Sequence, residues 1–180
     1  MNEYKILFTG TMGAGKTTAI ASISEVPPVV TDVANTDRAI GKPRTTVGLD
    51  FGQITLDSGD RLRLFGTPGQ SRFDFMWKIL VKNALGLIIL TDNSRPDPVG
   101  DLDVYLAGFA DDLDDLPCVI GVGRTETHRF PPLDAYGELL DRRRRVIPIV
   151  TVDVRRSEDV LMLIDILLAQ IEARSIGDFA

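Results

Sequence analysis

The chain has 180 residues, of which 44% are hydrophobic and 26% charged, and its formal net charge is −6 at pH 7. These values are typical of a globular protein with enough chain for one ordinary core. The acidic balance excludes a general affinity for nucleic acid, because such binding needs clustered cations that displace counterions. We expect one cytoplasmic domain over residues 1–175 and a short tail at residues 176–180.

Membrane attachment and cysteine chemistry find little support in the sequence. The longest uninterrupted apolar stretch, about residues 84–90, is too short to cross a bilayer. We expect no secretory leader and no lipid anchor, since residue 2 is not glycine and the last four residues form no prenylation box. Cys118 lies in an apolar run, which predicts a buried, inert thiol. His128, beside an arginine and before two prolines, predicts an exposed loop residue.

The first third of the chain predicts three strands, one helix and a long loop. Residues 4–8 are an apolar run typical of a buried strand, and residues 16–24 follow as a helix. Residues 25–44 contain three prolines and little periodicity, which indicates a long loop. Residues 48–56 and 61–65 predict two strands of a hairpin, because an Asp-Ser-Gly-Asp turn separates them.

Helices and strands alternate through the rest of the chain. After a helix at residues 71–83, the near-continuous apolar run at residues 85–90 indicates a central parallel strand covered on both faces. Pro148 in the last predicted strand favours an edge position. The further predicted elements are a helix at 101–113, a strand at 118–122, a helix at 133–141, a strand at 146–150 and a helix at 157–173. This alternation predicts an α/β fold with a mostly parallel six-stranded sheet, one antiparallel edge strand from the hairpin, and helices on both faces.

Residues 10–17 read Gly-Thr-Met-Gly-Ala-Gly-Lys-Thr and fit the pattern G-x-x-x-x-G-K-[ST], between a predicted strand and a predicted helix. Glycines let the backbone wrap a phosphate chain, and the helix adds its positive end. Lys16 would supply a charge toward the β- and γ-phosphates and Thr17 a hydroxyl to Mg²⁺. The motif therefore predicts the three-layer sandwich of P-loop NTPases. The predicted nucleotide-binding residues are Gly10, Thr11, Met12, Gly13, Ala14, Gly15, Lys16, Thr17 and Thr18.

Three further segments follow this motif in order. They read Thr-Val-Gly-Leu-Asp-Phe at residues 46–51, Gly-Thr-Pro-Gly-Gln-Ser-Arg-Phe at 66–73 and Thr-Val-Asp-Val-Arg at 151–155. From about residue 4 to residue 171, the chain resembles Ras-like small GTPases, whose two switch segments and guanine-closing loop these would be. The Thr-Pro-Gly-Gln version is similar to bacterial gliding- and twitching-motility and polarity GTPases, of the subgroup encoded beside Roadblock-type partner proteins.

The resemblance implies a switch that slowly hydrolyses GTP to GDP with Mg²⁺ and signals to regulatory or effector proteins. Thr46 would reach Mg²⁺ and the γ-phosphate, as Thr17 reaches Mg²⁺, and Gly69 would offer its backbone N–H to the γ-phosphate. Gln70 would be the catalytic residue that orients the attacking water. Asp153 and Val154 would lie against the guanine.

Two segments depart from the family pattern. Most Ras-like proteins begin the second switch with an Asp that helps to hold Mg²⁺ through water, whereas Gly66 occupies that position here, which predicts weaker Mg²⁺ retention. The guanine-reading Asn-Lys-x-Asp is replaced by Gly-Arg-Thr-Glu. Glu126 could still accept two hydrogen bonds from guanine, while Arg124 either stacks on the base or belongs to a solvated loop. Gly123 lacks the side chain that ties this loop to the phosphate loop.

Other functions stay open at this stage. A pseudo-GTPase scaffold would hold nucleotide with little hydrolysis, and a P-loop ATPase or kinase would prefer adenine. An arginine that stabilises transition-state charge could come from a partner or from Arg38, Arg44 or Arg72. The aromatic side chains of Phe73, Phe75 and Trp77 predict packing against the sheet, or a partly exposed patch that meets partners.

Overall fold

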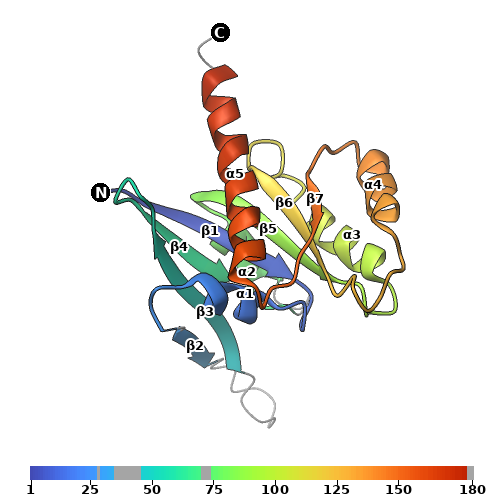
Figure 1. Cartoon of the computed structure of the whole chain (residues 1–180), viewed down its shortest axis with the longest axis horizontal. Helices are drawn as coiled ribbons and strands as arrows, with labels where there is room; N and C mark the ends of the chain where they lie inside the picture. Colours follow the sequence, from blue (N-terminus) through green and yellow to red (C-terminus); the bar gives the residue numbers. More distant parts are fainter. Residues whose placement is uncertain (28, 35–45, 70–73, 178–180) are drawn as a thin grey trace.

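The computed structural model describes residues 1–27, 29–34, 46–69 and 74–177. Strands and helices alternate along these residues, as predicted (Figure 1). The strands are β1 (Glu3–Gly10), β2 (Val29–Ala34), β3 (Thr46–Thr55), β4 (Arg61–Gly66), β5 (Ala84–Asp92), β6 (Cys118–Gly123) and β7 (Ile149–Thr151). The helices are α1 (Lys16–Ile23), α2 (Asp74–Leu80), α3 (Pro98–Gly108), α4 (Leu133–Arg142) and α5 (Ser157–Gly177).

One twisted sheet has the strand order β2-β3-β4-β1-β5-β6-β7. The pairs β1–β4, β1–β5, β5–β6 and β6–β7 are parallel, whereas β3 is antiparallel to both β4 and β2. The six predicted strands are all present, and the sheet is mostly parallel as expected. The expected strand count and edge were wrong, because β2 adds a seventh strand outside β3.

Strand β2 lies within residues 25–44, which we expected to be a loop. Its residues pair with β3 from Val29 opposite Phe51 to Ala34 opposite Thr46. Of the three prolines that suggested a loop, Pro43 comes after the strand in the sequence, whereas the two at residues 27 and 28 stand immediately before it. The β-branched residues that follow them favour an extended backbone once β3 supplies a pairing partner.

Several element boundaries differ from the predicted ones. Helix α3 begins at Pro98, because the Asp97 carboxylate caps it by accepting the Gly100 N–H at 2.9 Å. Strand β7 is at the edge of the sheet, as expected, but it begins after Pro148. Helix α5 continues to Gly177, beyond the predicted start of a tail at residue 176.

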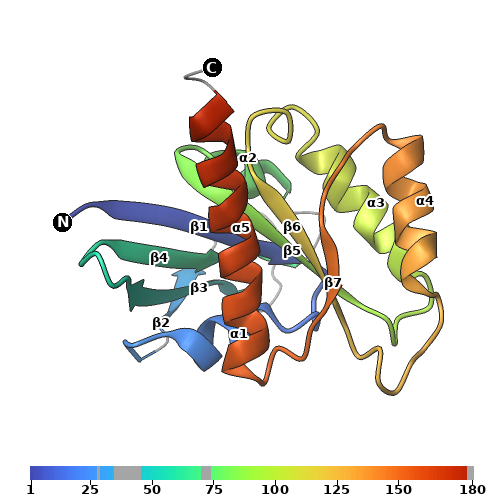
Figure 2. The same cartoon turned by 45° about the horizontal axis from the view of Figure 1, so that its top comes forward.

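Two apolar cores separate the three layers. Helices α1 and α5 cover one face of the sheet, and α2, α3 and α4 cover the other (Figure 1 and Figure 2). The central strands contribute alternate residues to the two cores, so that Leu87 and Ile89 face α3 while Ile88 and Leu90 face α5. This double burial explains why β5 is apolar without interruption. Cys118 is buried in the α3 core, as predicted.

Candidate functional site

A pocket of about 840 Å³ lies at the carboxyl ends of the parallel strands. Most of its lining comes from four segments that are distant in sequence, residues 12–18, 67–69, 123–127 and 152–155, and the rest from residues 50 and 91–92. Ligands of open α/β sheets bind in this position. The lining residues that were predicted as nucleotide-binding are Met12, Gly13, Ala14, Gly15, Lys16, Thr17, Thr18, Gly69, Arg124, Glu126, Asp153 and Val154. The lining residues that were not predicted are Asp50, Thr67, Pro68, Thr91, Asp92, Gly123, Thr127, Val152 and Arg155.

The glycine-rich loop, residues 10–17, joins β1 to α1 at the floor of this pocket. Gly10, with φ +136°, passes so close to β5 that a Cβ there would lie 2.1 Å from the Leu90 carbonyl oxygen. Gly15 has φ +97° and is the N-cap of α1, where no side chain caps the helix. The first N–H groups of α1 therefore have no capping side chain and are available to an anion.

Lys16 points back into the loop that precedes it. Its ammonium group donates to the carbonyl oxygens of Gly10 at 2.6 Å and Thr11 at 2.8 Å, and the residue is 7% exposed. Burial lowers the pKa of Lys16 to about 8, although the nearby Asp50 carboxylate acts in the opposite direction. A buried cation held by neutral carbonyls favours the approach of an anion, which would stabilise its charged form.

The Asp50 carboxylate reaches this site from β3, although no sequence motif marked it as a site residue. Asp50 lies opposite Gly66 in the antiparallel β3–β4 register. A Cβ at residue 66 would lie 3.0 Å from both Cβ and Oδ2 of Asp50, so a larger residue there would crowd this carboxylate. The Thr17 hydroxyl donates to Asp50 Oδ2 at 2.6 Å. The hydroxyl and the carboxylate thus stand together beside the first turn of α1.

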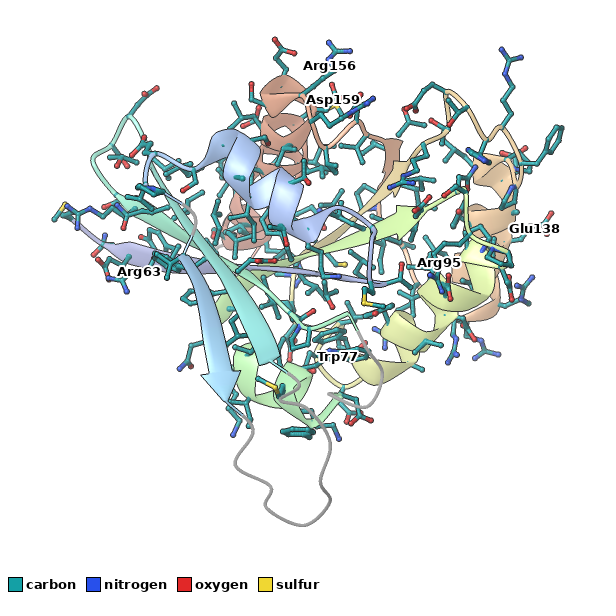
Figure 3. The ribbon with its side chains drawn as sticks, turned by 90° about the horizontal axis from the view of Figure 1, so that it is seen from below. Arg63, Trp77, Arg95, Glu138, Arg156 and Asp159 are labelled. Carbon is teal, nitrogen blue, oxygen red and sulfur yellow. The ribbon has the colours of Figure 1, made fainter. Side chains whose placement is uncertain are left out.

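Residues 67–69 lie over the glycine-rich loop and are held by two helices. The indole N–H of Trp77 donates to the Pro68 carbonyl oxygen at 3.2 Å, and the Tyr105 hydroxyl donates to that of Gly69 at 3.1 Å. Trp77, labelled on α2 in Figure 3, stacks on Tyr105 with ring centroids 4.6 Å apart. A Cβ on Gly69 would lie 2.5 Å from the Met12 nitrogen, so only glycine fits this approach without a shift.

Several predicted residues cannot be placed by side-chain contacts. Thr46 begins β3, but its side chain lies outside the described residues. Gln70 and the candidate arginines 38, 44 and 72 also lie outside them, as does Phe73. Of the other two aromatic residues, Trp77 is buried as predicted, whereas Phe75 is 58% exposed.

The loop after β6 is tied down through Arg124 and Asn93. Arg124, with φ +62°, has Nε 3.4 Å from Asp92 Oδ2 and donates through Nη2 to the Gly13 carbonyl oxygen at 3.5 Å. The tie to the glycine-rich loop that Gly123 cannot make therefore comes from its neighbour. Asn93 Nδ2 donates to the carbonyl oxygens of His128 and Pro131, and the buried Tyr136 hydroxyl donates to Asn93 Oδ1. The His128 side chain is exposed, as predicted.

The loop after β7 is fixed by Asp153. Its carboxylate accepts from the backbone N–H, Nε and Nη2 of Arg155 at 3.0, 2.8 and 2.6 Å. These bonds lower the pKa of Asp153 to about 2. The Asp153 N–H donates to Asp159 Oδ2 at 2.8 Å, which fastens the loop to the start of α5. Asp153, Val154 and Arg155 all line the pocket, and the Asp153 carboxylate is already engaged by Arg155.

Comparisons with known proteins add little to this geometry. No family model matches the chain. An uncharacterized protein of the archaeon Methanocaldococcus jannaschii is 28% identical over 97 residues, which are 52% of this chain. The match spans about half of that relative, 54% of its length. In the part of the chain that the structure describes, no helix is long and apolar enough to span a membrane.

Proposed function

We propose that this chain is a Ras-like GTP-binding switch that hydrolyses GTP slowly with Mg²⁺. The observation that carries the proposal is the juxtaposition of a buried lysine, an uncapped helix N-terminus and the Thr17–Asp50 pair at one end of the pocket. A phosphate chain would accept from the N–H groups of Gly13 and residues 15–18, as anions do at helix N-termini, since the Ala14 N–H is bonded to the Thr11 carbonyl oxygen. Lys16 would then exchange its carbonyl partners for phosphate oxygens.

Thr17 and Asp50 would hold the Mg²⁺ ion. A hydroxyl and a carboxylate oxygen are the hard ligands that Mg²⁺ prefers, and its remaining ligands usually come from phosphates and water. Among the described residues, no group of three or more His, Cys, Asp or Glu could hold a metal ion alone. Mg²⁺ would neutralise charge on the phosphates during hydrolysis. Asp50 would thereby supply the carboxylate whose loss at residue 66 led us to expect weak Mg²⁺ retention.

The residues that would promote hydrolysis lie in the segment after β4. Gly69 lies against Met12, where its backbone N–H would meet a γ-phosphate, and Gln70 follows immediately to orient a water molecule. Thr46, which begins β3, would report the presence of the γ-phosphate. Roadblock-type partners, a cytoplasmic location and a role in motility or polarity rest on the family resemblance alone.

Competition of GTP and ATP for the purified chain tests this function. Labelled GDP with Mg²⁺ should be displaced by GTP at lower concentration than by ATP, and tighter binding of ATP would remove the GTPase assignment. Single-turnover hydrolysis by wild type and Gln70→Ala tests the enzyme. The variant should be slower, whereas equal, near-zero rates would favour a nucleotide-binding scaffold.

A further inference from the structure

Two opposite charges from different loops lie near each other at the pocket. Glu126, from the loop after β6, and Arg155, from the loop after β7, both line the pocket. Arg155 Nη2 lies 3.8 Å from Glu126 Oε1. This separation is too long for a hydrogen bond, so each group keeps its hydrogen-bonding capacity toward a ligand.

The Arg155 guanidinium is positioned before any ligand arrives. Asp153 holds Nε and Nη2 in a bidentate pair, which fixes the plane of the guanidinium. Since a guanidinium carries five N–H donors, three remain for other acceptors. Asp153 is held in turn, because its backbone N–H donates to the carboxylate of Asp159, which is labelled in Figure 3 at the start of α5.

A carboxylate beside a guanidinium matches one purine better than the other. The Watson–Crick edge of guanine presents the O6 acceptor next to the N1–H and N2–H₂ donors, whereas adenine presents a donor at N6 and an acceptor at N1. Guanine therefore meets a donor at O6 and an acceptor at N1 and N2. Adenine would instead point its N6 donor at the guanidinium and its N1 acceptor at the carboxylate. A site built for hydrogen bonds rejects such a mismatch strongly.

We propose that Arg155 is a specificity-determining residue that donates to O6 of guanine, while Glu126 accepts from N1 and N2. The backbone N–H of Asp153 cannot serve O6 in this arrangement because it is bonded to Asp159. The proposal rests on the proposed function and names the group that selects guanine within it. In this arrangement guanine is recognised by a pair of side chains from two loops and not by the usual Asn-Lys-x-Asp segment.

The test compares diphosphates that differ at one atom of the base. Competition against labelled GDP would measure the dissociation constants of GDP, ADP, IDP, which lacks the N2 group, and 6-thio-GDP, which has sulfur in place of O6. The proteins are wild type, Arg155→Met and Arg156→Met. Arg156, also labelled in Figure 3, is the matched control, since it pairs with Glu158 and Asp159 and does not line the pocket.

Wild type and Arg156→Met should bind GDP about tenfold or more tighter than 6-thio-GDP and ADP, a factor that corresponds to about 1.4 kcal/mol. In Arg155→Met, the affinity for GDP relative to 6-thio-GDP should fall toward one. The affinity for GDP relative to IDP should stay as in wild type. An unchanged GDP to 6-thio-GDP ratio in Arg155→Met would overturn the role of Arg155 and leave the GTPase proposal standing. Failure of wild type to bind any of the four nucleotides would instead overturn the proposed function. If Arg155→Met does not fold, equal affinity of wild type for GDP and 6-thio-GDP would still refute the role.

Discussion

Asp50 and Gly66 face each other across the β3–β4 pair, and the absence of a side chain at one makes room for the carboxylate of the other. The two residues form a single local arrangement: the carboxylate stands on β3, and β4 carries the smallest residue beside it. The Thr17 hydroxyl donates to that carboxylate at 2.6 Å, so the Asp50 carboxylate lies beside the first turn of α1.

Exchanging the two residues should move the carboxylate to β4 without removing it. Asp50→Asn should weaken Mg²⁺-dependent GDP binding by about tenfold, as expected when a charged hydrogen-bond partner is lost. The double variant Asp50→Gly/Gly66→Asp should bind GDP more tightly than either Asp50→Gly or Gly66→Asp alone. Titration of Mg²⁺ during GDP dissociation measures both effects, with Asp165→Asn on the exposed side of α5 as the control. Unchanged Mg²⁺ dependence in Asp50→Asn would contradict this role.

Gly69→Ala should interfere with the glycine-rich loop. The added Cβ would lie 2.5 Å from the Met12 nitrogen and 2.9 Å from Lys16 Nζ, and the Met12 backbone has little freedom to yield. We expect the affinity for GTP to fall by about tenfold or more, a loss of at least about 1.4 kcal/mol. Gly137→Ala is the matched control, because its Cβ meets nothing within 4 Å and its helical position predicts a gain of about 0.5–1 kcal/mol in unfolding free energy. Equal GTP affinity in both variants would show that Gly69 has no such role.

Nucleotide binding should take up a proton above pH 8. The pKa of Lys16 is about 8 in the free protein because the ammonium group is buried. Bound phosphate would raise this pKa, so affinity should be constant below pH 8 and should fall as the pH rises beyond it. Calorimetry in buffers of different ionisation enthalpy measures the proton uptake. Proton release, or wild-type affinity that is independent of pH up to 9.5, would disagree with this assignment.

Tyr136→Phe should loosen the loop after β6 from a distance. The buried hydroxyl donates to Asn93 Oδ1 at 2.5 Å, and Asn93 holds the carbonyl oxygens of His128 and Pro131. Loss of the donor leaves a buried acceptor unsatisfied, which should lower the unfolding free energy by about 1–3 kcal/mol. Urea denaturation measures this loss, and GDP binding should weaken without a change in Mg²⁺ dependence. Wild-type stability of the variant would mean that Asn93 finds another partner.

Features formed by neighbouring residues could be predicted from the sequence, and features formed across strands could not. The glycine-rich loop is contiguous, so Gly13, Gly15, Lys16 and Thr17 could be grouped from the sequence, and all four line the same pocket. Asp50 was missed because its importance depends on the residue opposite it in another strand. Counting outward from a four-residue Asp-Ser-Gly-Asp turn would have placed Asp50 opposite Thr67, one residue away from the observed register, in which Thr55 lies opposite Arg61 and Asp50 opposite Gly66.

The other missed features have the same origin. Strand β2 exists because β3 offers it a pairing edge, and its two preceding prolines obscured this in the sequence. Gly123 makes no side-chain tie, as expected, but the sequence did not show that the neighbouring Arg124 ties the two loops together through Asp92 and Gly13. Arg155 was assigned no role because its position follows from the Asp153 carboxylate and from the approach of two separate loops.

Binding of labelled GDP to Lys16→Met, beside wild type and Lys82→Met, tests the central claim most directly. Both variants remove one positive charge, but Lys16 is buried at the pocket floor and Lys82 is exposed outside it. Wild type and Lys82→Met should bind GDP with Mg²⁺ equally well, and Lys16→Met should lose about a hundredfold in affinity, or roughly 2.7 kcal/mol. Affinity of Lys16→Met equal to that of wild type would contradict the assignment of this pocket to a nucleotide's phosphates.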